Sequence, residues 1–444
     1  MPSLLILIKN HKENLMFIRS LILFFVVFAF PVNAAVNIDS WITDKGARVL
    51  FVKNHDLPII DVEVSFKAGS AYDRLESAGT ASLTNHMMLL GSDNLKQEEI
   101  INKFTEIGAE IGSGFDQDKS SFSLRTLSEK KQEAFKLFQL VLHKPNFDKD
   151  IVEREKQRYI SSIRQSDTLP DSIGSKAFMK AMYGDHSYAL PSSGFVESVE
   201  KINDTDLKSF YDSTYSPKSA VIVIVGDLSK KEATLFANQI SHDLPSNKNL
   251  QSLKEVKLNQ SQTIKIDHPS SQAHLHFGYP IMKRGDKDFF PLYVGNYILG
   301  GGGFVSRLTE EVREKKGYVY SVYSYFMPMQ EKGPFQIGLQ TKKEQIDQAF
   351  DLVKKVVKEF IDFGPTEKEL VAAKSNMVGG FPLRLDSNKK IMNYISMMAF
   401  YNYPLDYLET FSEKVKAVTT EQIKDAFKRR VKLDEFTTVI VGAS

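Results

Sequence analysis

Three polar side chains, Ser82, Asn85 and His86, fall within the stretch GTASLTNHMMLLGS, residues 79–92. The apolar residues of this stretch recur at helical spacing and Gly91 closes it, so the sequence predicts a short helix. Residues at i, i+3 and i+4 share one face of a helix. This face would present a hydroxyl, an amide and a single imidazole. Because zinc in proteins takes three or four ligands from His, Cys or carboxylate groups, the face cannot hold zinc by itself.

A second pair of polar residues, Arg313 and Tyr320, lies in the sequence VREKKGYVYSVYS. Arg313 comes late in a predicted helix, Gly317 suits the position just after it, and Tyr320 opens the next strand. A helix end and the adjoining strand can aim both side chains at one point, where their donors would suit a carbonyl oxygen that gains negative charge. The spacing alone also allows Arg313 to pair with Glu310 on a solvated face and Tyr320 to pack in a sheet.

A run of four glycines, Gly300, Gly301, Gly302 and Gly303, precedes that helix. The run matches neither phosphate-binding pattern, since it lacks both G-x-G-x-x-G after a strand and Gly-Lys-Ser/Thr. Two interpretations remain open. The run is either a flexible connector or a mobile loop whose backbone, free of side chains, can lie close to a peptide.

Other groups that could do chemistry are few. The chain has no cysteine, so neither a disulfide framework nor a thiolate metal site can form. His274 and His276 flank Leu275 in a strand pattern and would project from one face of a sheet, most simply as hydrogen-bonded structural residues. No His, Asp and Ser arrangement has the spacing of a known nucleophilic hydrolase. The sequence therefore predicts no catalytic residue that acts in this chain alone.

The N-terminus has the pattern of a secretory signal peptide. A ten-residue apolar run, Leu21–Phe30, follows Arg19 and precedes a small-residue site that ends at Ala34. The run is too short to span a bilayer. Cleavage of residues 1–34 would leave a periplasmic or otherwise exported chain without a stable membrane span. Because the charged region before the apolar run is unusually long, translation could start at Met1 or at Met16.

The charge of the exported chain argues against nucleic acid as a partner. Residues 1–34 contain three basic and one acidic residue, which leaves 54 of each sign. No basic block stands out from this neutral background. With 42% hydrophobic and 25% charged residues, the chain can build an ordinary core.

Two pairs of segments indicate that the chain is internally duplicated. Residues 202–226 align with residues 418–442 without a gap, at an offset of 216. Each segment reads as a capped amphipathic helix followed by a buried strand. A second pair, beginning at Gln132 and Asp347, repeats a helix, a proline-containing loop and a helix.

The duplication predicts an α+β fold of two homologous domains. Each domain would be a mainly antiparallel sheet covered by helices. The predicted boundaries are 36–245 and 258–444, and the polar residues 246–257 would form the linker.

Three stretches resemble the pitrilysin/insulinase family of zinc metallopeptidases, which includes the mitochondrial processing peptidase. AGSAYDRLESAGTASLTNHMMLLGS is similar to the family's strand, loop and metal-binding helix. YGDHSYALPSSGFVESVEKINDTDLKSFYDSTYSPKSAVIVIVGD resembles its signature to the end of the first domain, and His186 in it would fix a loop. GGGGFVSRLTEEVREKKGYVYSVYS resembles its second-domain glycine loop, helix and strand. With the duplication, the resemblance covers residues 36–444.

The resemblance implies that the zinc site is degenerate. Catalytic members bind zinc through the two histidines of H-x-x-E-H and a glutamate about 76 residues further on. In this chain Ser82 and His86 stand at the histidine positions, Asn85 replaces the general base, and Ser162 stands at the third ligand. Glu155 keeps another acidic position of the family pattern. A serine hydroxyl is a poor zinc ligand and an amide cannot accept a proton from water, so no metal is expected in this chain.

The same resemblance implies that the substrate-binding half of the site is kept. In the family, an Arg and a Tyr with the spacing of Arg313 and Tyr320 reach a peptide bound at the zinc. The expected function is a substrate-binding, non-catalytic subunit of a heteromeric peptidase, with zinc in a partner that carries an intact H-x-x-E-H. Two alternatives stay open: a structural or peptide-binding protein without proteolysis, and a metallopeptidase that acts alone.

Overall fold

The computed structural model describes residues 36–247 and 252–442. Residues Ile38–Ser444 belong to one compact unit. The predicted signal peptide, residues 1–34, lies outside the described residues. Within the described ranges, no helix is long and apolar enough to cross a membrane.

A six-stranded sheet forms the centre of the first half, in the order β1-β2-β8-β3-β7-β6. Only β2 and β8 run parallel to each other; the other neighbouring pairs are antiparallel. All residues of β8 are buried, as expected for a β-branched strand covered on both faces. The strands are β1 (Ile38–Ile42), β2 (Arg48–Lys53), β3 (Ile59–Phe66), β6 (Glu110–Phe115), β7 (Ser120–Leu127) and β8 (Ala220–Gly226), beside a small hairpin of β4 (Gly91–Ser92) and β5 (Leu95–Lys96).

A five-stranded sheet in the second half repeats this topology, in the order β11-β12-β10-β13-β9. Again one neighbouring pair, β9 and β13, is parallel and the others are antiparallel. Read from the opposite edge, the order β9-β13-β10-β12-β11 corresponds strand by strand to β2-β8-β3-β7-β6. The strands are β9 (Thr263–Ile266), β10 (Gln272–Met282), β11 (Val319–Phe326), β12 (Gly333–Lys342) and β13 (Thr437–Val441).

The gapless sequence repeat corresponds to equivalent elements. Helix α8 (Asp204–Thr214) and helix α15 (Thr420–Arg430) begin and end 216 residues apart. Each leads through a 3₁₀ turn into the central parallel strand of its sheet, β8 or β13. The predicted α+β fold with an internal duplication is therefore confirmed.

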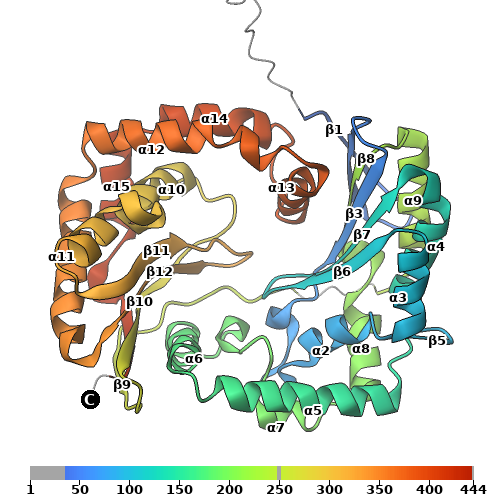
Figure 1. Ribbon diagram of the computed structural model, residues 1–444, viewed down its shortest axis with the longest axis horizontal. Coiled ribbons are helices and arrows are strands. Elements are labelled where there is room, and N and C mark those ends of the chain that lie inside the picture. The colour runs from blue at the N-terminus through green and yellow to red at the C-terminus, as the bar shows by residue number, and fades with distance from the viewer. Residues whose placement is uncertain (1–35, 248–251, 443–444) are drawn as a thin grey trace, which may run out of the picture. The chain divides into compact units, whose positions relative to one another are not determined.

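Helices cover both sheets (Figure 1). In the first half these are α2 (Thr80–Met87), α3 (Gln97–Glu106), α4 (Lys131–His143), α5 (Lys149–Ser166), α6 (Pro170–Tyr183), α7 (Val196–Val199) and α9 (Lys230–His242). In the second half these are α10 (Phe289–Asn296), α11 (Ile346–Phe363), α12 (Glu367–Gly379), α13 (Asn388–Phe400) and α14 (Tyr407–Ala417). The aromatic rings of Phe135 on α4 and Phe236 on α9 stack 3.8 Å apart over the first sheet, and Phe360 on α11 meets Phe427 on α15 over the second.

The two halves exchange one helix each. Helix α6 of the first half lies against β10 and β13 of the second sheet, and α13 of the second half lies against β3 and β8 of the first sheet (Figure 1). The contact is close, because a Cβ atom at Gly174 on α6 would lie 2.7 Å from Nε2 of His276 on β10. Val256, within the predicted linker, is buried with Phe178 and Val439 in a cluster that both halves share. This part of the linker is thus packed into a core cluster that both halves share, beside the larger core of the first half.

Asp118 joins the halves at a second place. Its side chain is buried and accepts hydrogen bonds from the hydroxyl of Tyr188 at 2.5 Å, the hydroxyl of Tyr401 at 2.8 Å and the amide of Gln330 at 2.7 Å. The amide of Glu331 donates in turn to the Tyr188 oxygen. Burial, together with the nearby Asp118 charge, raises the pKa of both tyrosines. Asp118 therefore helps to fix the loop between β11 and β12 to the first half, together with the hydroxyls of Tyr183 and Tyr188, which bind Lys332 and Glu331.

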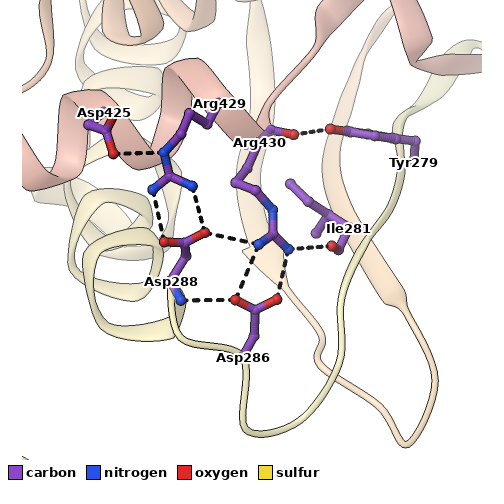
Figure 2. A network of polar contacts seen from close by, with 7 residues as sticks. All are labelled: Tyr279, Ile281, Asp286, Asp288, Asp425, Arg429 and Arg430. Carbon is purple, nitrogen blue, oxygen red and sulfur yellow. Dashed lines mark hydrogen bonds and ion pairs between the residues drawn. The ribbon is translucent and has the colours of Figure 1, made fainter.

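Two arginines at the end of α15 hold the segment that leads into α10 (Figure 2). Arg429 binds Asp288 through two hydrogen bonds of 3.0 and 2.9 Å, and also binds Asp425. Arg430 contacts Asp288, both oxygens of Asp286 and the carbonyl of Ile281. Hydrogen bonding to Arg429 keeps the pKa of Asp288 below its ordinary value, although burial acts in the opposite direction. Paired guanidinium and carboxylate planes of this kind fix the position of α10, and with it the start of the glycine run.

Candidate functional site

Asp73 fixes the start of α2, the helix that carries the degenerate motif. Its carboxyl oxygens accept from the amide of Gly79 at 2.8 Å and from the amide of Ala81 at 2.9 Å. These amides belong to the first turn, where a helix offers no internal partner. Burial raises the pKa of Asp73 to about 7, while the two hydrogen bonds act to lower it.

Asp73→Asn should therefore change how stability depends on pH. The folded-state pKa lies above the unfolded value of about 3.9, so the folded protein holds an extra proton between these two values. Stability from this group is full below about pH 4 and is lost as the pH rises through about 7. The free energy of unfolding of the wild type, minus that of Asp73→Asn, should fall by at most about 1.4 kcal/mol per pH unit across this window.

Urea unfolding of both proteins from about pH 5 to about pH 8 measures this difference. Asp185→Asn, on a fully exposed carboxyl, is the matched control and should give a constant difference. A constant difference for Asp73→Asn as well would contradict the assignment.

The three polar residues of α2 have separate roles. His86 donates from Nε2 to Glu155 on α5 at 3.1 Å, and the hydroxyl of Ser82 lies 3.4 Å from the hydroxyl of Tyr159, also on α5. Asn85 is buried and points the other way, with its amide group donating to Gly114 and Ser120 of the β6–β7 hairpin. Asn85, which stands at the position of the general base, thus links α2 to the sheet by hydrogen bonds.

Glu155 is the acidic residue that binds His86, and its carboxylate already has other partners in the protein. Its side chain is 4% exposed and accepts hydrogen bonds from His86, Arg154 and Arg158. Burial acts to raise the pKa of Glu155, but the hydrogen bonds from His86 and Arg154 and the charge of Arg158 bring it below its ordinary value. The carboxylate is therefore stabilised by cations of the protein itself.

Zinc does not fit this set of donors. His86 and Glu155 provide two groups that bind each other, and serines stand at the other two ligand positions. Among the described residues, no group of three or more His, Cys, Asp or Glu side chains could hold a metal ion. A site with two protein ligands, one of them neutralised by two arginines, lacks the three that a catalytic zinc needs.

A cavity of about 850 Å³ opens at these residues. Ser82, His86 and Ser162 all line it, as the spacing of the degenerate motif predicts. All residues that line it lie between positions 82 and 193, in the first half of the chain. Its wall is rich in hydroxyl groups, from Ser82, Ser162, Ser166, Ser172, Ser175, Ser192, Ser193 and Tyr159. Hydroxyls donate and accept hydrogen bonds, so the wall suits peptide groups.

The glycine run lies in two helical turns. Tyr297–Gly301 forms a π-helical turn and Gly303–Val305 a 3₁₀ turn. A Cβ atom at Gly300 would lie 2.3 Å from the hydroxyl oxygen of Ser324 on β11, so only glycine fits this turn. Gly300 and Gly301 thus belong to a helical turn, and the two interpretations of the run, a flexible connector or a mobile loop close to a peptide, stay predictions. Gly302 connects the two turns, and Gly303, with φ at +63°, opens the second.

Arg313 and Tyr320 lie where the sequence predicts. Arg313 is in the last turn of a π-helical segment, Thr309–Glu314, and Gly317 follows it with φ at +64°. Tyr320 is the extra residue of a β-bulge near the start of β11, and 53% of it is exposed. Neither residue lines the cavity at His86. Within this chain, the two parts of the expected site are thus separate.

The predicted histidine pair lies on one face of β10. His276 is buried, with Nε2 3.7 Å from Asp171 and with a hydrogen bond between its Nδ1 and Gln336. His274 lies 3.6 Å from the same carboxylate. Burial lowers the pKa of His276, although Asp171 acts to raise it. The pair belongs to the contact with α6. His186 binds the Tyr188 amide and the Lys254 carbonyl and so fixes its loop, as predicted.

Two neighbours of His86 were missed from the sequence, Tyr159 and Arg158. Both lie on α5 within one turn of Glu155, and both line the cavity. The signal was present, because residues three and four positions after Glu155 share its face of the helix.

Two family profiles match the chain. Residues 48–194 match the insulinase family, peptidase family M16, and residues 201–377 match the "Peptidase M16 inactive domain". The chain is 26% identical over 406 residues to the "Non-peptidase homolog YmxG" of Helicobacter pylori, covering 90% of this chain and 93% of the relative. It is 24% identical over 402 residues to the "Uncharacterized zinc protease YmxG" of Bacillus subtilis, covering 90% and 97%.

A solved structure agrees with the profiles. The crystal structure of a "peptidase M16 inactive domain" from Pseudomonas fluorescens superposes with a TM-score of 0.89 at 38% sequence identity. The match covers 92% of this chain and 99% of that one. This chain therefore belongs to peptidase family M16, the insulinase family.

Proposed function

We propose that this chain is an exported, non-catalytic subunit of a heteromeric zinc peptidase, in which it binds the peptide substrate. One observation carries the proposal. The side chains at the zinc positions, Ser82, His86 and Ser162, cannot hold the metal, whereas Arg313 and Tyr320 are kept and accessible. The inactive-domain profile and the non-peptidase name of the Helicobacter pylori relative support the same interpretation.

The proposed partner is a second chain of the same family with an intact H-x-x-E-H. Zinc bound there would activate the attacking water. The guanidinium of Arg313 and the hydroxyl of Tyr320 would bind the carbonyl oxygen of the scissile peptide bond. Both groups are donors, so their hydrogen bonds would strengthen as that oxygen becomes negative. The chain would thereby complete an active site that it cannot form by itself.

The second candidate is a peptide-binding or structural protein of the same fold without proteolysis. The Helicobacter pylori relative is named a non-peptidase homolog, and this name favours the second candidate. The two candidates differ in one observable, the presence of a catalytic partner.

Recovery of the tagged chain from the native periplasmic fraction tests the proposal. A copurifying chain with H-x-x-E-H and zinc-dependent peptide cleavage by the complex are expected. The mass of the recovered chain should correspond to a start at Ala35, which tests export in the same sample. A stable complex without peptidase activity would favour the second candidate, and an intact N-terminus in a cytoplasmic fraction would exclude export.

A further inference from the structure

Phe304 and Val305 are among the most exposed large apolar side chains in the described part of the molecule. Each is 74% exposed, and they are adjacent in the 3₁₀ turn that follows the glycine run. Removing apolar side chains of this size from water on contact with a ligand is favourable. Two side chains placed side by side in water therefore form an unused apolar contact surface.

The turn that carries them is rigidly built. Ser306 is fully buried, and its amide and hydroxyl both donate to the carbonyl of Gly303, at 3.1 and 2.7 Å. The Ser306 hydroxyl also lies 3.1 Å from the hydroxyl of Thr309. On the other side, a Cβ atom at Gly302 would lie 2.6 Å from the carbonyl of Tyr297. Because the turn is fixed at both ends, the exposure of the two apolar side chains is part of the fold.

Arg313 lies directly over the ring of Phe304. Its guanidinium carbon is 5.0 Å from the ring centroid, a cation–π contact. Its Nε is 3.8 Å from Glu314, beyond hydrogen-bonding distance, and the Arg313 side chain is 38% exposed. The guanidinium therefore has one face on an aromatic ring and keeps N–H groups for a ligand. The apolar ring of Phe304 and the N–H donors of Arg313 therefore lie next to each other on the surface.

We infer that Phe304 and Val305 form a specificity-determining subsite for a large apolar side chain of the peptide, next to the carbonyl that Arg313 binds. The inference rests on the proposed function, since it names the substrate class of the same site. A peptide residue with an apolar side chain matches this arrangement, because its side chain can pack on Phe304 while its carbonyl accepts from the N–H groups of Arg313. The preferred substrates are thus peptides with Leu, Phe or a similar residue beside the scissile bond.

Phe304→Ala tests this inference in the reconstituted complex. The substrates are two peptides that differ only in Leu or Ser beside the scissile bond. The ratio of their kcat/KM values should favour Leu in the wild type and should fall about 10-fold or more in the variant, because a lost apolar contact of this size is worth about 10–200-fold. Cleavage of the Ser peptide should fall less than cleavage of the Leu peptide, because any effect through the Arg313 contact with the ring is common to both peptides and cancels in the ratio. Phe363→Ala is the matched control, since Phe363 is 73% exposed at the end of α11.

Binding of the same labelled peptides to the chain alone, followed by fluorescence anisotropy, gives a readout without a partner. Phe304→Ala should reduce the preference for the Leu peptide there too. Loss of turnover in Arg313 and Tyr320 variants with an unchanged Leu/Ser ratio in Phe304→Ala would overturn the subsite and leave the proposed function intact. Weaker assembly with the partner at an unchanged ratio would assign the two side chains to the subunit interface and also overturn it. A Leu preference that is lost in Phe304→Ala without any catalytic partner would support the subsite even if the proposed heteromer fails.

Discussion

Arg313→Lys and Tyr320→Phe should each lower the turnover of the reconstituted complex by about 100- to 1000-fold, the effect of removing one donor from an oxyanion. Lysine keeps the charge of Arg313 but loses the planar fork of donors. Phenylalanine keeps the ring of Tyr320 and removes only its hydroxyl. Both side chains are substantially exposed, so neither change should empty a core or prevent assembly. The fall should appear in kcat rather than in the stability of the complex.

Peptide cleavage at saturating substrate measures this effect, with size-exclusion chromatography to verify assembly. Two controls carry the same chemical changes elsewhere. Tyr323→Phe alters another exposed tyrosine of β11, and Arg164→Lys alters an exposed arginine of α5 that pairs with Glu200. Both controls should keep full turnover. Equal turnover for Arg313→Lys, Tyr320→Phe and the controls would contradict a role in catalysis. Arg313 would then be a surface charge and Tyr320 a packed aromatic residue of the sheet.

Asp118→Ala should destabilise the protein by about 3–5 kcal/mol, because each buried donor left without a partner costs about 1–3 kcal/mol. The change removes the acceptor of three hydrogen bonds and leaves two tyrosine hydroxyls and the Gln330 amide unpaired in the interior. Asp118→Asn should lower the free energy of unfolding by less than Asp118→Ala does. The amide oxygen of Asn can still accept hydrogen bonds, although its NH₂ group replaces one acceptor by a donor.

Hydrogen exchange separates this effect from a general loss of stability. The amides of Gln330 and Glu331 bind Asp118 and Tyr188, so they should lose protection in Asp118→Ala before the strands of either sheet do. Asp185→Ala, at a fully exposed carboxyl, should change stability by less than about 0.5 kcal/mol. Unchanged protection of the two amides would show that the carboxylate does not hold the loop.

The elements around the site were largely predictable because their signals are local. The end of the Arg313 helix is marked by Gly317, and Tyr320 is the second residue of the next strand. The duplication was visible because α8 and α15 kept the same length and each leads into an equivalent strand. Such features depend on residue types and spacing within single segments of the chain.

Features that depend on distant residues were not predictable. The π-helical turn at Gly300 depends on close packing against Ser324, and the burial of His276 depends on α6 from the other half. Asp118 is one acidic residue among many in the sequence, and only the fold brings Tyr188, Tyr401 and Gln330 around it. The pairing of His86 with Glu155 likewise joins two helices 69 residues apart. The roles of these side chains depend on contacts with residues far away in the sequence, and the local spacing of residue types does not show such contacts.

The zinc content of the purified single chain is the most direct test of the account. Elemental analysis after mild dialysis should find no stoichiometric zinc, because His86 and Glu155 bind each other and serines occupy the other ligand positions. The chain alone should not cleave peptides with added zinc, and activity should arise only when the H-x-x-E-H partner is present. One firmly bound zinc per chain that is lost in His86→Ala, together with cleavage by the single chain, would contradict the account.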